Sequence, residues 1–181
     1  MSNLSAATGT WVIDPTHTSL GFSARHAMVA KVRGTFGEFA GSFTIDGDNL
    51  AASTAEVTIQ VASIDTKTAD RDTHLKSPDF LDVENFPTIT FVSTAVTPKG
   101  DDVVITGDLT IHGVTKSVEI EYEFVGISQD PWGQTKIGFE GSTKISRKDF
   151  GLTWNAALET GGVLVGDEIK LNLDVEATKQ A

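Results

Sequence analysis

Two stretches in the second half of the chain alternate between apolar and polar residues, and this alternation constrains the fold more than any other feature. In residues 117–124, SVEIEYEF, every second side chain is apolar and three of the others are glutamates. Residues 169–175, IKLNLDV, follow the same pattern. A period of two is typical of an antiparallel strand with one buried face and one face in water. Both stretches are therefore predicted to be strands of an antiparallel sheet.

Weaker alternation predicts more strands along the chain. They cover residues 10–14, 18–26, 34–46, 55–64, 88–97, 102–111 and 134–146. Turn sequences such as DGDN (46–49), PKGDD (98–102) and DPWG (130–133) separate many of them. Short antiparallel strands at such spacing indicate an all-β barrel or sandwich. Gly34, Gly37 and Gly41 inside one strand favour the sharp coiling of a closing barrel.

The alternation stops between Thr66 and Phe80. Thr68 is suited to a helix N-cap, acidic residues follow it, and Lys76 precedes Pro78. One short helix is therefore predicted around residues 67–77, covering one end of the β structure. The rest of the chain contains no linker or repeat, so a single domain is predicted over residues 10–178 after an N-terminal tail, residues 1–9.

Composition excludes several classes of function. The formal charge of −11, with no basic stripe, disfavours binding to nucleic acid or to an anionic membrane surface. The absence of cysteine excludes disulfides and thiolate chemistry. No apolar run is long enough for a membrane span, so stable membrane insertion is not expected. Without a signal peptide at its start the chain is expected in the cytoplasm, or in the periplasm or outside the cell if a leader has been removed.

The segment DRDTHLKSPDFLDV, residues 70–83, concentrates charged groups around three apolar side chains. Arg71, Asp72 and His74 could form an acid–base set, although charges at helix ends commonly serve only the helix. No nucleophile or phosphate-loop motif accompanies them. None of the four histidines is spaced from another as a pair of metal ligands usually is, but His26, His74 and His112 could still converge in space. Both an enzyme and a metal-binding barrel remain open as alternatives.

Five segments together resemble the YceI family. They are WVIDPTHTSLGFSARH (11–26), RGTFGEFAGSF (33–43), SIDTKTADRDTHLKSPDFLDVENFPTITFVS (63–93), GDLTIHGVTKSV (107–118) and SRKDFG (146–151). The resemblance implies an elongated, lipocalin-like antiparallel barrel of about eight strands. It also implies non-catalytic binding, carriage or storage of a long-chain polyisoprenoid lipid, an isoprenoid quinone or a polyprenyl phosphate, in an apolar tunnel. No further cofactor is required by this reading, and a homodimer is left open.

The tunnel predicted from alternation and from this resemblance is largely aromatic. Its lining is predicted to comprise Phe22, Phe36, Phe39, Phe43, Leu75, Phe80, Phe86, Phe91, Leu109, Tyr122, Phe139, Trp154 and Leu171. Arg25, His26, Arg71 and His74 are predicted to meet the head group at the mouth, where arginine suits a phosphate. The sequence does not distinguish a hollow barrel from one filled by its own side chains.

Overall fold

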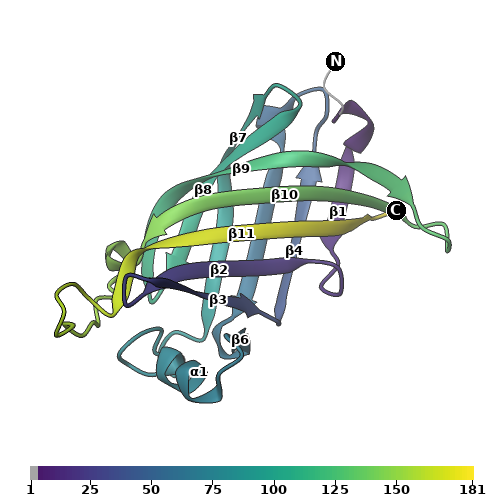
Figure 1. The fold of residues 1–181 in the computed structure, drawn as a ribbon. Coiled ribbons are helices and arrows are strands. Elements are labelled where there is room, and N and C mark those ends of the chain that lie inside the picture. The colour runs from purple at the N-terminus through teal and green to yellow at the C-terminus, as the bar shows by residue number, and fades with distance from the viewer. Residues whose placement is uncertain (1–3) are drawn as a thin grey trace.

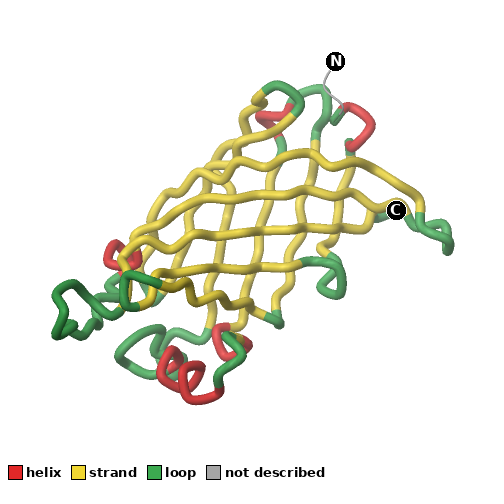
Figure 2. The backbone as a smooth tube through the Cα atoms, in the orientation of Figure 1, coloured by secondary structure: helices red, strands yellow, loops and turns green. Residues whose placement is uncertain are grey.

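The computed structural model describes residues 4–181, and its strands form one antiparallel sheet (Figure 1). The strands are β1 (Gly9–Ile13), β2 (Ser19–His26), β3 (Ala30–Phe36), β4 (Phe39–Ile45), β5 (Thr54–Gln60), β6 (Ile64–Asp65), β7 (Thr88–Lys99), β8 (Asp102–Ile111), β9 (Val114–Gln129), β10 (Thr135–Ser146) and β11 (Val165–Lys179). The helical segments are α1 (Ala69–Lys76) and the short 3₁₀ turns η1 (Ser5–Ala7), η2 (Leu50–Ala52), η3 (Val61–Ser63) and η4 (Arg147–Phe150). In Figure 2 the strands form the wall, and helices and loops gather at its two ends.

Eight of the strands close into a barrel, one of the two architectures that the alternation predicts. Their order is β1-β4-β5-β7-β8-β9-β10-β11, and β11 pairs back onto β1. This seam is short, because only residues near the C-terminal end of β11 meet β1. Earlier residues of β11 pair with β2, which carries β3 and β6 beyond it and lengthens the wall. The prediction of an all-β antiparallel barrel of about eight strands is confirmed.

The boundaries differ from the predicted ones in two places. The single strand predicted over residues 34–46 is two strands, β3 and β4, which turn at Gly37 and Glu38. The backbone N–H of Gly37 donates to the carbonyl of Ser63, 3.2 Å away, which fixes this corner. The strand predicted over residues 55–64 ends at Gln60 for the same reason, since η3 and β6 turn there to meet β3.

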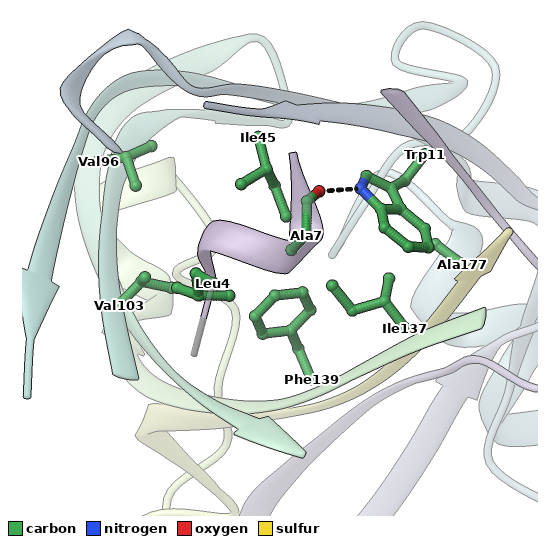
Figure 3. Close-up of a cluster of buried hydrophobic side chains, with 9 residues drawn as sticks. All are labelled: Leu4, Ala7, Trp11, Ile45, Val96, Val103, Ile137, Phe139 and Ala177. Atoms are coloured by element: carbon green, nitrogen blue, oxygen red, sulfur yellow. Dashed lines mark hydrogen bonds between the residues drawn. The ribbon is translucent and has the colours of Figure 1, made fainter. Parts of the chain in front are cut away.

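One barrel end is sealed by a close-packed apolar cluster (Figure 3). Leu4 and Ala7 come from the predicted tail, yet both are buried, and η1 lies across the barrel opening. The indole Nε1 of Trp11 donates to the carbonyl of Ala7 over 2.8 Å, which holds η1 in place. The cluster, here called the sealed end, comprises Leu4, Ala7, Trp11, Ile45, Val96, Val103, Ile137, Phe139 and Ala177.

Helix α1, the β2–β3 hairpin and the loop of residues 151–164 gather at the other end, here called the open end (Figure 1). The predicted helix is confirmed at 69–76, with Thr68 at the N-cap position but without a side-chain capping bond. No helix within residues 4–181 has the length and apolar content needed to cross a bilayer.

Glycine opposite an aromatic ring recurs along the wall. Gly34 lies opposite Phe22 and Gly141 lies opposite Tyr122, and a Cβ at either glycine would collide with the ring. The ring therefore lies flat over the neighbouring strand, which allows the strand to curve while its apolar surface stays covered.

Candidate binding cavity

The barrel encloses a cavity of about 440 Å³ at the open end, a volume within the range of ligand pockets. Strands from several sides of the barrel, α1 and the 151–164 loop supply its walls. The apolar lining consists of Phe22, Ala24, Val32, Phe36, Ile64, Leu75, Phe80, Leu81, Ile89, Ile111, Ile145, Phe150, Leu152, Trp154, Leu164, Val165, Ile169 and Leu171. The polar lining consists of Arg25, His26, Asp70, Arg71, His74 and Arg147.

A second cavity, of about 100 Å³, lies toward the sealed end and shares no lining residue with the first. Ile105 on β8 and Val175 on β11 line the smaller cavity, while Ile111 and Leu171 on the same strands line the larger one. Leu109 and Leu173 occupy positions between these pairs and line neither. Two apolar chambers therefore lie along the interior, with leucine side chains between them.

The structure places the predicted tunnel residues in three groups. Six line the larger cavity: Phe22, Phe36, Leu75, Phe80, Trp154 and Leu171. Four line the smaller one: Phe43, Phe91, Tyr122 and Phe139. Phe39, Phe86 and Leu109 line neither of these two cavities, and their place in a lipid tunnel stays a prediction. Phe39 and Leu109 are buried in the packed core, and Phe86 stacks edge-on against His112, where strand alternation no longer applies.

All four predicted head-group residues line the larger cavity. The guanidinium of Arg71 donates from Nε to the hydroxyl of Thr66 (2.8 Å) and from Nη2 to its carbonyl (2.7 Å). Asp72 holds the same residue from the other side, accepting the Thr66 backbone N–H over 2.9 Å. These bonds fix α1 against the short strand β6 and orient Arg71 at the cavity wall.

His74 sits between two aromatic rings at the wall of the larger cavity. Its ring centroid lies 5.0 Å from that of Phe80 and 4.8 Å from that of Trp154, both in edge-on arrangements. Its Nε2 lies 2.9 Å from a carboxylate oxygen of Asp79. Helix α1 and the 151–164 loop are thereby joined across the open end.

Sequence reasoning missed a buried cation, Arg147, which begins η4 and lines the larger cavity. Only 3% of this residue is exposed, and its guanidinium donates to the carbonyls of Leu152, Trp154, Val165 and Gly166 over 2.7–3.3 Å. Burial lowers its pKa, while Asp167 opposes that shift. The motif SRKDFG contains this residue, but only the fold shows that its side chain points inward.

The lining of the larger cavity is cationic although the chain is acidic. Three arginines line it against one aspartate, Asp70, in a chain of formal charge −11. The guanidinium of Arg25 donates no hydrogen bond within residues 4–181, and that of Arg71 uses only Nε and Nη2. The chamber therefore combines apolar walls with guanidinium donors, an arrangement suited to an apolar chain with an anionic or polar end.

The acid–base set left open by the sequence is not assembled. Asp72 binds Thr66 and His74 binds Asp79, so the two side chains have different partners. Residues two apart on a helix point in different directions, which explains the separation. Within the described chain this pair forms no relay.

The three histidines considered as metal ligands do not converge either. Across residues 4–181 one group of three potential ligands gathers, and it consists of Asp14, His17 and Glu176. The ammonium of Lys136 lies 3.3 Å from Asp14 and 4.0 Å from Glu176, so a cation already sits between the carboxylates. His17 and Thr16 hold the pKa of the Asp14 carboxyl well below its usual range, and Asp14 in turn raises the pKa of His17.

Known proteins resemble this chain in sequence and in architecture. Residues 11–177 match the YceI-like domain. Protein YceI of Escherichia coli is 43% identical over 164 residues, which cover 91% of this chain and 83% of that protein. The crystal structure of Burkholderia cenocepacia BcnA superposes with a TM-score of 0.78 at 26% identity, covering 92% of this chain and 99% of that one. A polyisoprenoid-binding domain from Saccharophagus degradans shares the fold, with a TM-score of 0.72 at 13% identity over 94% of this chain and 98% of that domain.

Proposed function

Because the chain belongs to the YceI-like family, we propose that it binds a long-chain polyisoprenoid lipid and carries or stores it unchanged. One observation carries the proposal: an apolar chamber of about 440 Å³ at the open end whose wall also presents arginine donors. The prenyl chain would occupy the apolar part, and the head group would meet Arg71 and His74. The Saccharophagus degradans domain of the same fold is a polyisoprenoid-binding one, which supports this choice of ligand.

The energetics favour an apolar chain. Each methylene-sized group moved from water into the chamber contributes about 0.8 kcal/mol, so even half of a long prenyl chain contributes several kcal/mol. Ordering that chain and losing its free motion offsets part of this gain. A longer chain would reach the smaller chamber only if the side chains of Leu109 and Leu173 rotate away from the barrel axis.

The head group we propose is a phosphate rather than a quinone. A quinone needs one or two neutral donors, whereas the chamber wall carries three guanidinium groups and one carboxylate. A neutral quinone ring would leave that positive charge without a partner, and an unpaired charge in an apolar site costs free energy. A polyprenyl phosphate would accept from the free edge of Arg71.

An enzyme acting on the head group is the second candidate, and the geometry does not favour it. His74 faces the chamber, but its bonded carboxylate, Asp79, belongs to the following loop and is about half exposed. A general base needs an orienting partner and a pKa matched to its task, and no serine, threonine, cysteine, lysine or tyrosine is among the residues that line the chamber. We expect incubation with a polyprenyl phosphate or a reduced quinone to return either one unchanged.

The test of lipid binding is to fill each chamber in turn. Ala24 lines the larger cavity and Ala55 the smaller one, so a larger side chain at either position would fill that cavity. The variants Ala24→Phe and Ala55→Phe are purified alongside the wild type, and bound lipid is measured by native mass spectrometry. We expect Ala24→Phe to lose most of the lipid and Ala55→Phe to shorten the longest chain retained. Equal retention in Ala24→Phe and wild type would contradict the placement of the ligand.

The test of the head group compares two ligands on one variant. Arg71→Ala should weaken binding of a polyprenyl phosphate about tenfold or more, since a charge-assisted bond is worth roughly 1.5–3 kcal/mol. It should change binding of a quinone with the same prenyl chain much less. Lys99→Ala removes a cation at the distant β7–β8 turn and serves as the control. Lost thermal stability with unchanged retention of both lipids would assign Arg71 to the fold alone.

A further inference from the structure

The open end exposes large apolar side chains at two neighbouring hairpin tips. Met28 and Val29, at the tip of the β2–β3 hairpin, are 62% and 83% exposed. Val163, in the turn closed by the bridge between Ala157 and Val163, is 41% exposed. Single exposed apolar residues are common, but three at adjoining tips form a surface that needs an explanation.

The two tips form one surface, here called the apolar lip and defined as Met28, Val29 and Val163. The backbone N–H of Ala27 donates to the carbonyl of Leu164 over 2.8 Å. The sulfur of Met28 lies directly over Gly162. The lip also borders the larger cavity, because His26 and Leu164, which flank the two tips, both line it.

Basic residues flank the lip. No Asp or Glu occurs between residues 15 and 37, a stretch that contains Arg25, Lys31 and Arg33. Arg25 lies directly opposite Lys31 in the hairpin. Val32 lines the cavity, so its neighbours Lys31 and Arg33 point outward, and both are exposed. No carboxylate of residues 4–181 lies within 4.0 Å of any of these three cations.

This hairpin carries features that cost stability. Two like charges face each other across the strands, which is unfavourable. Ala27 and Met28 adopt left-handed backbone conformations, with φ of 48° and 63°, which non-glycine residues rarely take. Local arrangements that oppose stability are expected where a surface serves a function.

We propose that the apolar lip docks on the surface of an anionic phospholipid bilayer and brings the mouth of the larger cavity to the membrane. Apolar side chains that enter the boundary between head groups and acyl chains, flanked by cations that meet lipid phosphates, are the pattern of interfacial binding. Docking of this kind is peripheral and reversible, and it goes beyond lipid binding because it supplies the route by which a bilayer lipid could reach the cavity.

The acidity of the whole chain does not prevent this docking. Glu119, Glu121 and Glu123 lie on β9, three strands from β2 in the sheet order. At about 4.8 Å per strand they are some 14 Å away, beyond the screening length of about 8 Å at physiological ionic strength. Glu159 is the one carboxylate in the 157–163 turn, and it is exposed. Asp167 and Glu168 on β11 lie nearer the lip, but each has a partner: Asp167 accepts from the Ser146 hydroxyl over 2.6 Å, and Glu168 lies 3.3 Å from the ammonium of Lys144. The cations of the hairpin, rather than the net charge of the chain, would therefore meet the bilayer.

The test measures partitioning of the full chain onto vesicles of phosphatidylcholine with a minor fraction of phosphatidylglycerol. Met28→Asn with Val29→Ser should reduce partitioning about tenfold or more, because two exposed apolar groups lose their burial. Asparagine suits the left-handed backbone at position 28. Lys31→Ala with Arg33→Ala should reduce partitioning about tenfold, and added salt should remove this difference.

The controls lie at the opposite end of the barrel. The β9–β10 turn lies there (Figure 1). Its Trp132 is 85% exposed, and Trp132→Ser removes this exposed apolar group. Lys99→Ala removes a cation at the β7–β8 turn. Neither should change partitioning, and retention of lipid that is already loaded in the cavity should be equal in all variants. Failure of the wild type to bind vesicles, or equal losses in lip and control variants, would overturn the proposal. The proposal would also be overturned if the lip residues were needed for binding a protein partner and the chain did not bind vesicles.

Discussion

The two ends of the barrel have the same strands but opposite chemistry. At the sealed end Trp11 and Ala7 are fully buried, a 3₁₀ turn fills the opening, and the remaining space is about 100 Å³. At the open end the space is about 440 Å³, arginines line it, and apolar side chains project into solvent. The difference indicates that packing at one end stabilises a barrel whose other end is left incompletely packed for a ligand.

The largest effect should come from the centre of the sealed end. Trp11→Ala removes a fully buried indole and its bond to the Ala7 carbonyl, so we expect a loss of about 3–5 kcal/mol of unfolding free energy. For a chain of this length that lowers Tm by on the order of 10 °C, as thermal unfolding followed by circular dichroism would show. Trp132→Ala, at an exposed tryptophan, is the control and should change Tm very little. A small loss for Trp11→Ala would mean that the barrel does not depend on its sealed end.

The second effect tests whether stability resides only at the sealed end. Arg147→Met keeps the bulk of the side chain but leaves the carbonyls of Leu152, Trp154 and Gly166 without this donor, while the carbonyl of Val165 keeps the side-chain amide of Asn155. Unpaired buried acceptors cost roughly 1–3 kcal/mol each, and relaxation of the 151–164 loop recovers part, so we expect a loss of about 3 kcal/mol. Hydrogen exchange should locate the change in residues 151–166. Unchanged protection there would show that the guanidinium does not organise the open end.

Alternation along the strands predicted more of the fold than of the site. The alternation of apolar Ile120 with charged Glu121 predicts which face of β9 is buried, because the side-chain period of a strand is fixed by its geometry. The turn at Gly37 was missed because the bond that fixes it comes from Ser63, distant in sequence. Arg147 was missed because a buried cation is satisfied by carbonyls, which leave no pattern in the side-chain sequence. Phe39 and Phe86 show that aromatic character alone does not decide which side chains face a cavity.

The seam beside the sealed end should show a smaller effect that depends on pH. Glu176 lies where β11 changes partner from β2 to β1, and the Asp14–Thr18 turn is fastened to it. The backbone N–H of Asp14 donates to the Glu176 carbonyl (2.8 Å), and the Thr18 hydroxyl bonds both backbone groups of Glu176. The Asp14 carboxylate also contacts two basic side chains: Nδ1 of His17 lies 2.9 Å from it and Nζ of Lys136 lies 3.3 Å from it.

The direction of each pKa shift gives the pH window. The pKa of Asp14 is lowered on folding, so its contribution is present above about pH 4 and is lost as the pH falls toward the folded pKa. The pKa of His17 is raised, so its contribution is present below about pH 6.5 and is lost as the pH rises through the folded pKa. The pair should therefore stabilise the seam most between these two values.

Asp14→Asn should lower Tm by about 2–4 °C inside that window, as expected for roughly 1 kcal/mol. The difference from the wild type should shrink on the acid side, where the wild-type carboxylate is protonated, and partly on the alkaline side, where Lys136 remains as partner. His17→Asn should remove only the alkaline change. Glu168→Gln, in the exposed pair with Lys144, is the control and should leave the profile unchanged. A Tm difference that is constant with pH would show that the Asp14 side chain acts through shape rather than charge, and the seam would then hold by its backbone bonds alone.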